Sequence, residues 1–473
     1  MNDEARAELL VVGAGPGGYA AAFLAADLGL KVVLIDPEDN PGGVCLYRGC
    51  IPSKALLHVA ALIWEVAEAR RFGLGFGAPD VDLDAVRAFR SDVVKRLTGG
   101  LGQLAGQRKV RFIQGRAAFS GPQSVVVEGG DGRREHLGFR QAVVATGSQP
   151  ALPAGFPPPS GRVWTSDEAL ALPSVPPRLL VVGGGYIGLE LGSVYAALGS
   201  RVTVAEMTPS LLPGADADLV KPLARRLAGR LEAVHLRTRV AEVEEVDGGV
   251  RVVLEGPEAA TAEDTFDSVL VAVGRRVDAA ALGLESAGVA VGGDGYVPVD
   301  AQRRTDRDGI FAVGDMVGQP MLAHKAAHEG RVAAEAAAGL PSVYEPAAVP
   351  AVVYTEPEVA WCGLTETQAR AVGREVKVAR FPWAASGRAL TTGRDEGLTK
   401  LVLDPDTERV LGVGVCGHGA GELIAEGVLA VEMGAVARDL ALSVHPHPTL
   451  SETLMEAAAA FYGQATHIHR PRR

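Results

Sequence analysis

Two stretches of the chain, about 170 residues apart, repeat one pattern of apolar residues and glycines. In the first, apolar residues 9–12 lead into the turn GAGPGG at 13–18 and then into an alanine-rich segment that ends near Leu28. In the second, residues 179–182 lead into GGGYIG at 183–188 and a segment that ends near Leu198. A short apolar run before glycines is typical of a buried strand, and the segment after each turn has the length of a helix. Each stretch therefore predicts a strand, a tight turn and a helix.

Each predicted helix is followed by a second apolar run, which ends on the acidic residue Asp36 in the first unit and Glu206 in the second. Both acids stand 18 residues after the last glycine of their turn. In dinucleotide-binding units the first glycine makes the turn, the second lets backbone amides approach a diphosphate, and the third lets the helix pack on the strand. The helix N-terminus attracts the anion, and the acid accepts hydrogen bonds from a ribose. The sequence thus predicts two bound dinucleotides, one at Gly13, Gly15, Gly18 and Asp36 and the other at Gly183, Gly185, Gly188 and Glu206.

Two further strands complete these units. A strand that starts at residue 141 ends at Thr146-Gly147, and a proline-rich stretch at 150–159 follows, where we place a domain boundary. An apolar run at 268–273, just before Gly274, has the same place in the second unit.

The C-terminal part has a different pattern. A strand that ends on Asp315 and a helix at 322–338 come before a second proline-containing stretch at 341–350. Beyond it, strand-like and helical runs alternate, which is typical of an α+β unit. Strands are predicted at 398–403 and 410–415, and helices at 420–433 and 451–461.

Composition and charge exclude several classes of protein. A chain of 473 residues with 47% apolar residues can fill the cores of three domains. Its net charge of −11 does not favour nucleic acid or an anionic membrane as a partner. We expect no signal peptide, because the first residues are acidic, and no membrane span, because no apolar run approaches about 18 residues. The 4 cysteines are too few for a disulfide framework. A cytoplasmic, multi-domain protein is expected.

The cysteines Cys45 and Cys50 lie in the segment GGVCLYRGCIPSK, after the first acid and before a helix expected from Lys54 to about residue 70. Their spacing is not that of a zinc site, and no second cysteine or histidine pair completes one. In a regular helix their Cα atoms would be about 8.7 Å apart, beyond the ~4.4–6.8 Å of a disulfide. A bridge therefore needs an irregular turn, which Gly49 and Pro52 favour. We interpret the pair as redox-active; two buried free thiols are the alternative.

Near the end of the chain, HPHPTLSE at 445–452 precedes the last predicted helix. His447, with Glu452 five residues later, has the pattern of a base and the group that orients it. In the alternative interpretation, Ser451 or Thr449 caps the helix and Glu452 only offsets its dipole. These residues alone do not decide between the two.

Together these motifs resemble the dihydrolipoyl dehydrogenases, flavoproteins of the class I pyridine nucleotide-disulfide oxidoreductase family. The resemblance covers essentially the whole chain, including YTEPEVA at 354–360 and HPTLSE at 447–452. It implies an α/β fold with two Rossmann-like domains, which bind FAD and NAD, and a C-terminal α+β dimerisation domain. The FAD domain would comprise residues 1–150 and 277–345, the NAD domain 151–276 and the dimerisation domain 346–473.

The resemblance also implies an activity and its partners. A homodimer would oxidise protein-bound dihydrolipoyl groups to lipoyl, and hydride would pass through the flavin to NAD. Its partners would be the lipoyl domains and core acyltransferase of a 2-oxo acid dehydrogenase complex.

Site residues follow from the same resemblance. Cys45 and Cys50 would form a disulfide, in which Cys45 resembles the thiol that exchanges with substrate and Cys50 the one that faces the flavin. His447 resembles the base and Glu452 its orienting group, which favours the catalytic interpretation. The remaining FAD matches are Asp36, Lys54 with Glu190, Ala117, Thr146, Gly147, Asp315, Met321, Leu322, Ala323 and His324; the NAD matches are the second glycine turn, Glu206, Val240 and Gly274.

The chain departs from the family pattern at three positions. Tyr47-Arg48 stand where Asn-Val is usual, and Asp36 stands where Glu is usual. No chemical group is lost, although Tyr47 and Arg48 can alter the disulfide potential or substrate access.

Other classes fit less well. Glutathione-type reductases use NADPH, whose 2′-phosphate Glu206 would repel, and mercuric reductases carry a C-terminal cysteine pair that this chain lacks. Related flavin transhydrogenases lack the cysteine pair near the first unit, and a non-catalytic NAD-sensing flavoprotein would leave that pair without a role.

Overall fold

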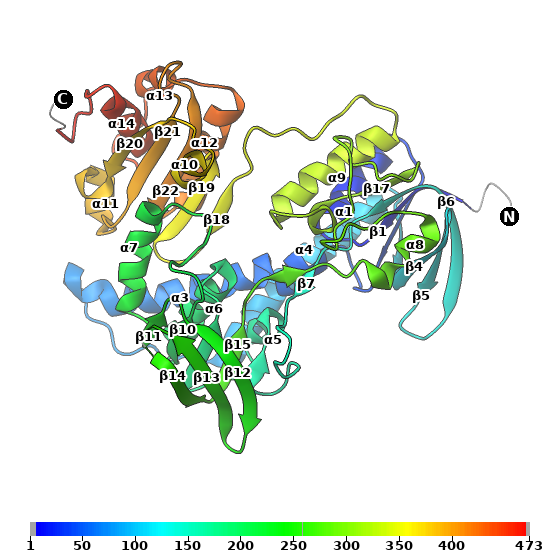
Figure 1. Cartoon of the computed structure of the whole chain (residues 1–473), viewed down its shortest axis with the longest axis horizontal. Helices are drawn as coiled ribbons and strands as arrows, with labels where there is room; N and C mark the ends of the chain where they lie inside the picture. Colours follow the sequence, from blue (N-terminus) through cyan, green and yellow to red (C-terminus); the bar gives the residue numbers. More distant parts are fainter. Residues whose placement is uncertain (1–5, 258, 470–473) are drawn as a thin grey trace.

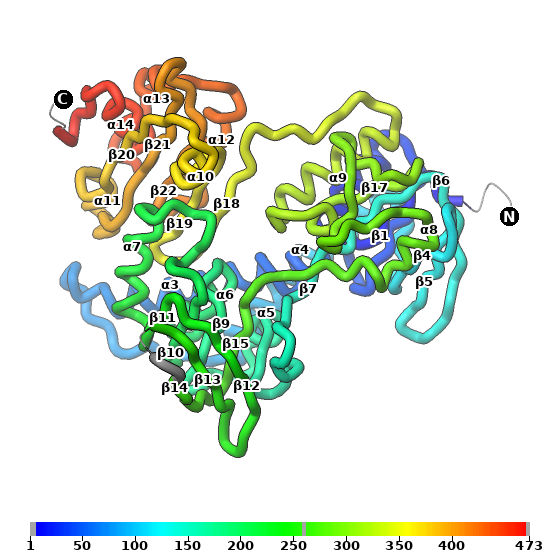
Figure 2. Tube along the Cα trace, in the orientation of Figure 1, coloured from blue at the N-terminus to red at the C-terminus, as the bar shows by residue number. Residues whose placement is uncertain are grey.

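The computed structural model describes residues 6–257 and 259–469 (Figure 1). In this part of the chain, a 7-stranded sheet, a 5-stranded parallel sheet beside a 3-stranded antiparallel one, and a 5-stranded antiparallel sheet follow one another along the sequence. The sheets lie in separate parts of the molecule, and Figure 2 shows the chain leaving the first part and returning to it before it enters the C-terminal part. The acidic first residues lie outside the described residues.

The first unit is built around β1 (Ala7–Val12), whose residues are almost all apolar and buried. Helices α1 (Pro16–Asp27) and α9 (Ala323–Ala337) pack against each other beside this sheet (Figure 1). The parallel strands run in the order β3 (Arg111–Gln114), β2 (Val32–Asp36), β1, β6 (Arg134–Val144) and β17 (Ile310–Ala312); β6 continues into antiparallel pairing with β5 (Ser124–Glu128), which pairs with β4 (Arg116–Gly121). Both strands of each expected strand–turn–helix–strand unit are present, and so is the expected strand before Asp315.

The second unit repeats this architecture. Its parallel order is β11 (Ala233–His235), β10 (Arg201–Ala205), β9 (Arg178–Val182), β15 (Ser268–Val271) and β8 (Val163–Trp164), and the antiparallel strands are β12 (Arg239–Val246), β13 (Gly249–Gly256) and β14 (Ala259–Phe266). Helix α6 (Tyr186–Ala197) follows the second glycine turn. The chain crosses between the units twice, at β7 (Gln149–Pro150) and β16 (Arg275–Arg276), and these two crossings pair with each other.

The C-terminal part is an antiparallel sheet with helices, as the alternating pattern predicts. Its strands run in the order β18 (Ala351–Val353), β19 (Glu358–Gly363), β22 (Val410–Gly417), β21 (Leu398–Leu403) and β20 (Lys377–Pro382). Helices α12 (Ala420–Glu432) and α14 (Glu452–Phe461) lie where helices were expected.

The cysteine segment folds as two helices rather than one. α2 (Gly43–Arg48) ends before Gly49, and α3 (Cys50–Glu68) begins four residues earlier than the sequence predicts. Gly49 makes the break between them, since a Cβ there would lie 2.8 Å from the carbonyl oxygen of Val44. The irregular turn that a bridge needs is therefore present between the two cysteines.

The helices between Gly43 and Phe72 are together long and apolar enough to cross a membrane by length and composition alone, a test that a core helix also passes. In this structure α3 packs against α4 (Leu83–Gln107) and α6, and its buried residues Leu56 and Ala60 belong to the core of the second unit.

An ion cluster holds the far end of α3. Glu68 accepts hydrogen bonds from Arg226 and, at 2.9 Å, from Arg230, whose guanidinium also donates to Glu356 at 2.8 Å. Arg394 completes the cluster through Glu356. Because the helix carries Cys50 at its other end, this cluster fixes the helix against both the second unit and the C-terminal part.

Candidate active site

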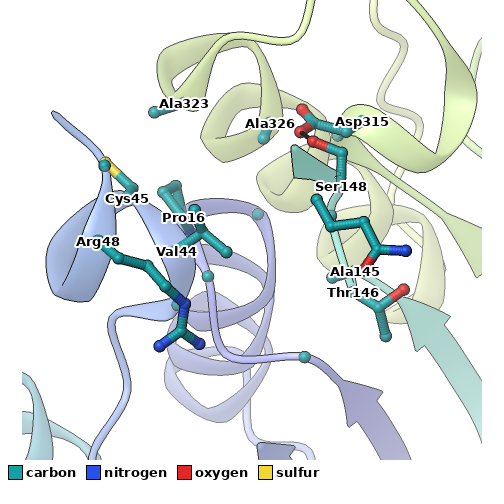
Figure 3. Close-up of a pocket in the computed structure, with 18 of the residues that line it drawn as sticks. Pro16, Val44, Cys45, Arg48, Ala145, Thr146, Ser148, Asp315, Ala323 and Ala326 are labelled. Atoms are coloured by element: carbon teal, nitrogen blue, oxygen red, sulfur yellow. Dashed lines mark hydrogen bonds between the residues drawn. The ribbon is translucent and has the colours of Figure 1, made fainter. Parts of the chain in front are cut away.

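A cavity of about 470 Å³ lies between the first glycine turn, the cysteine helices and α6 of the second unit (Figure 3). It brings together residues that are far apart in the sequence. Of those that the resemblance assigns to FAD or to the thiol chemistry, it is lined by Gly13, Gly15, Asp36, Cys45, Cys50, Lys54, Ala117, Thr146, Gly147, Glu190, Asp315, Met321 and Ala323.

The first glycine turn forms one wall of the cavity. Gly13 has a φ of +94°, and a Cβ there would lie 2.5 Å from the carbonyl oxygen of Ala145, so only glycine fits. Asp36 accepts a hydrogen bond of 2.6 Å from the Ala14 amide, which ties the acid to the turn. Burial raises the pKa of Asp36, against the opposing effect of its hydrogen bonds from the Ala14 and Glu38 amides. Among the described residues no side chain caps α1, so its first amides face the cavity and can bind an anion.

The cysteine helices reach this turn through glycines. The Gly42 amide donates to the Ala14 carbonyl at 2.8 Å, and a Cβ on Gly43 would lie only 2.4 Å from the Cα of Gly15. Gly43 also has a φ of +56°, which favours glycine. The glycines before Cys45 therefore let the redox segment approach the dinucleotide turn.

Cys45 and Cys50 are free thiols in this structure, rather than the disulfide that the resemblance implies. Interaction with Cys50 and burial raise the pKa of the Cys45 thiol, whereas interaction with Cys45 lowers the pKa of Cys50 to about 7. The Lys54 ammonium also favours the Cys50 thiolate. The arrangement is that of a reduced dithiol in which one sulfur holds the proton and the other the negative charge.

Lys54 is joined to the second unit. Its Nζ lies 2.8 Å from the buried Glu190 carboxylate and 4.5 Å from the centre of the Tyr354 ring. Glu190 also accepts a hydrogen bond of 2.9 Å from the Tyr354 amide. The expected pairing of Lys54 with Glu190 is present, so the lysine is held at the cavity rather than extended into solvent.

A polar chain on the opposite side was missed by the sequence analysis. Ser148 donates to the Asp315 carboxylate, and Arg275 donates to the hydroxyl and the carbonyl of Ser148 at 2.7 and 2.6 Å. Figure 3 shows Ser148 and Asp315 across the pocket from Cys45 and Arg48. The positions of Ser148 beside Thr146-Gly147 and of Arg275 beside Gly274 were the available signals.

The second glycine turn repeats the first but faces elsewhere. A Cβ on Gly183 would lie 2.5 Å from the Ala272 carbonyl oxygen, and Glu206 accepts a hydrogen bond of 2.6 Å from the Gly184 amide. Val240 is buried in the core beneath this unit, and Gly274, with a φ of +130°, precedes the crossing at β16. These residues, with Gly185 and Gly188, lie outside the lining of the cavity.

Three other expected residues also lie outside that lining. Gly18 packs α1 on its turn, since a Cβ there would lie 1.8 Å from the Gly13 oxygen. Leu322 precedes α9, and His324 faces the Pro350 carbonyl at 2.7 Å.

His447 and Glu452 meet in the C-terminal part, away from the cysteines. Nδ1 of His447 lies 2.8 Å from the Glu452 carboxylate, and 70% of the imidazole side chain is exposed. Glu452 also accepts from the Thr449 amide at 2.8 Å. Partial burial raises the pKa of Glu452, but the two hydrogen bonds outweigh it, so the pKa is lowered. The carboxylate stays charged and fixes the ring, with Nε2 left to act on a proton.

The cavity fits FAD on its own features. The uncapped α1 N-terminus suits a diphosphate, the turn at Gly13 leaves no space for a side chain, and Asp36 suits a ribose. Cys50 and Lys54 line the same cavity, so a bound flavin and the dithiol share one space.

Known proteins agree with this geometry. Residues 7–330 match the pyridine nucleotide-disulphide oxidoreductase family and residues 349–458 its dimerisation domain. Dihydrolipoyl dehydrogenases of Vibrio cholerae and Thermus scotoductus are 46% and 48% identical over 99% and 98% of this chain, and the matches cover 98% of each relative. LpdA of Mycobacterium tuberculosis superposes with a TM-score of 0.88 at 29% identity, over 96% of this chain and 99% of that one. Enzymes of this kind use FAD and NAD(H). The chain belongs to the pyridine nucleotide-disulphide oxidoreductase family.

Proposed function

We propose that the protein oxidises protein-bound dihydrolipoyl groups to lipoyl with reduction of NAD⁺ to NADH. The observation that carries the proposal is that Cys45 and Cys50, on either side of the break between α2 and α3, line one cavity with the first glycine turn. The curated relatives support it, since they are named dihydrolipoyl dehydrogenases and match nearly the full chain.

The thiol chemistry starts from the oxidised pair. His447 takes the proton of one dihydrolipoyl thiol, and the resulting thiolate attacks Cys45 in the Cys45–Cys50 disulfide. The S–S bond breaks, and its electron pair leaves on Cys50, which the Lys54 ammonium stabilises as a thiolate. The second substrate thiol then displaces Cys45 and passes its proton to that sulfur as lipoyl is released, so Cys45 becomes a thiol and His447 keeps the first proton. The pair is left as the thiol and thiolate of this structure.

The cofactors take up the electron pair of that dithiol. FAD, when bound, supplies a two-electron acceptor between the dithiol and NAD⁺. Within the chain, we assign the first glycine turn, Asp36 and the polar chain to Asp315 to holding FAD. Glu190 keeps Lys54 at the dithiol. We assign the second glycine turn and Glu206 to NAD.

His447 must come from a second copy of the chain in this mechanism. It lies outside the lining of the cavity that holds Cys45, and it belongs to the segment that matches a dimerisation domain. We therefore assign each site to two protomers of a homodimer, with His447 of one protomer facing Cys45 of its partner.

The assignment extends to domains and partners. The FAD domain takes residues 1–150 and 277–345, the NAD domain 151–276 and the dimerisation domain 346–473. The partners are the lipoyl domains and acyltransferase core of a 2-oxo acid dehydrogenase complex, and the compartment is the cytoplasm.

A direct assay tests the activity. The purified, FAD-loaded protein should form NADH from NAD⁺ and free dihydrolipoamide, and absence of NADH formation would overturn the proposal. His447→Gln should lower kcat about 10²–10⁴-fold with FAD content unchanged, as expected for a lost general base. His445→Gln is the matched control, because His445 is 7% exposed and pairs with Glu426 instead; it should lose far less activity.

Mixed dimers test whether two protomers share the site. Homodimers of Cys45→Ser should be inactive and those of His447→Gln nearly so, but a heterodimer of the two holds one intact site if the site is shared. Activity should return when they are refolded together. If heterodimers verified by mass stay inactive, the site is built within one chain.

A further inference from the structure

Arg48 stands beside the cofactor cavity, between the two cysteines, where the family pattern has valine. It lies in the last turn of α2 and lines the cavity (Figure 3). Its Nη2 donates to the Glu38 carboxylate at 2.6 Å, and its Nε lies 3.7 Å from Asp167. Glu38 follows the acid of the first unit, whereas Asp167 lies in the first turn of α5 (Ser166–Ala171) in the second unit. One guanidinium thus faces carboxylates from both units.

These carboxylates set the charge at this end of the cavity. Asp36 and Glu38 line the same cavity as the first glycine turn. Burial is the main effect on Asp36 and on Asp167, and it raises the pKa of each, but the charge of Arg48 acts against it in both. Arg275 also acts on Asp167. Without Arg48, an anion at the α1 N-terminus would face a group of carboxylates with one fewer cation.

We propose that Arg48 is a cofactor-retaining residue of this chain, which neutralises Glu38 and its neighbouring carboxylates so that the diphosphate of FAD stays bound at the first glycine turn. The inference rests on the proposed function in so far as FAD occupies this cavity. A diphosphate carries negative charge, and like charges close to it weaken its binding, whereas one compensating cation removes much of that repulsion.

Tyr47, the neighbouring residue that also differs from the family pattern, provides a matched control. Its hydroxyl donates to Asp39 at 2.6 Å, and the residue lines a second cavity of about 300 Å³ rather than the cofactor cavity. Tyr47→Asn restores the usual family residue, as Arg48→Val does at the next position. Only the second substitution removes a charge from the cofactor cavity.

FAD release from the loaded protein is the measurement. FAD that passes an ultrafiltration membrane is followed over time for the wild type, Arg48→Val, Arg48→Lys and Tyr47→Asn. Arg48→Val should release FAD about fivefold faster, the upper range for a half-exposed ion pair, while Arg48→Lys and Tyr47→Asn stay close to the wild type. Added NaCl should shrink the difference between the wild type and Arg48→Val, because salt screens charges near solvent.

A double variant separates charge neutralisation from mechanical bracing. Glu38→Gln in the Arg48→Val background removes the uncompensated carboxylate, so release should slow again towards the wild-type rate. Equal release rates for the wild type and Arg48→Val, or a double variant as fast as Arg48→Val, would overturn the inference. A wild-type protein that binds no FAD would instead overturn the proposed function, so the two failures are distinguishable.

Discussion

The two glycine-rich units are close copies in topology and in local hydrogen bonding, yet only one of them faces the thiol chemistry. Each has a central strand flanked by parallel strands in the same order, and in each the acid accepts a 2.6 Å hydrogen bond from an amide of its own turn. The first glycine of each turn would place a Cβ 2.5 Å from a carbonyl oxygen of the neighbouring segment. The turn itself therefore does not determine what each unit does.

The difference lies six residues after each acid, where the chain returns to the turn. In the first unit the Gly42 amide donates to the Ala14 carbonyl at 2.8 Å, and in the second the Leu212 amide donates to the Gly184 carbonyl at 3.0 Å. The contact is the same, but glycines lead into a cysteine helix in the first unit. In the second, Leu211 and Leu212 are buried there. The two units therefore share one scaffold, and the segment that follows the acid places the cysteines beside the first glycine turn only.

The largest expected effect comes from removing what the first unit alone possesses. Cys45→Ser and Cys50→Ser should both abolish oxidation of dihydrolipoamide, because neither leaves a pair that can form a disulfide. Both should still bind FAD and oxidise NADH with an artificial electron acceptor, since the second unit is untouched. Loss of the acceptor reaction together with the dihydrolipoamide reaction would show that the units are not separable in this way.

The same variants identify the sulfur that contacts the flavin. Cys45→Ser should show a thiolate-to-flavin charge-transfer band beyond the oxidised flavin peak without reduction, and Cys50→Ser should not. In the reduced wild type, the band should grow as the pH rises through about 7, because the pKa of Cys50 is lowered to about that value and the thiolate is the absorbing form. A band in Cys50→Ser would reverse the assignment of the sulfurs.

A second effect should separate the two glycine turns. Gly13→Ala should weaken FAD binding at least about 100-fold, or ~2.7 kcal/mol, because the methyl group meets the Ala145 carbonyl and the φ of +94° disfavours alanine. Gly183→Ala should keep its FAD and instead raise the KM for NAD by a similar factor. FAD absorbance and KM give the two readouts.

Gly29→Ala is the control for backbone strain, since Gly29 has a φ of +93° with nothing within 4 Å of the added Cβ. It should cost stability without changing either cofactor. The comparison breaks if Gly183→Ala loses FAD while Gly13→Ala retains it.

Local patterns predicted the core of each dinucleotide unit, because apolar periodicity and glycine placement are features of the local sequence. The strands of the two repeated segments, both turns and their acids follow from them, as do β21, β22, α12 and α14 in the C-terminal part. The predicted start of α3, at Lys54, was wrong. Gly49 ends α2 and a new helix begins at once, so Cys50 is helical although its sequence context suggested a turn.

Long-range contacts in the site were harder to predict. Arg275 and Ser148 are 127 residues apart and meet only because the two crossings between the units pair with each other. No spacing rule encodes that pairing. The position of His447 outside the cavity of its own chain likewise depends on how the C-terminal part lies, which the HPHPTLSE pattern does not report.

The smallest expected effect comes from substituting the acids of the two units, Asp36 and Glu206, which we assign to different cofactors. Glu206→Gln keeps an oxygen that can accept from the Gly184 amide but removes the charge that would repel a 2′-phosphate. The native protein should strongly prefer NAD to NADP, and the variant should shift the ratio of kcat/KM values about tenfold towards NADP, or ~1.4 kcal/mol.

Asp36→Asn is the matched change in the first unit. Asp36 also accepts from its turn, at the Ala14 amide, but it lines the FAD cavity, so its replacement should weaken FAD retention and leave the NAD-to-NADP ratio unchanged. A change in that ratio in Asp36→Asn would show that the first turn also takes part in selecting the nicotinamide cofactor. Equal kcat/KM values for NAD and NADP in the native protein would contradict the role of Glu206 altogether, because its carboxylate then exerts no repulsion on the 2′-phosphate. The two acids make the same hydrogen bond to their turns. If both results come out as expected, the segments around the acids decide which cofactor each acid binds.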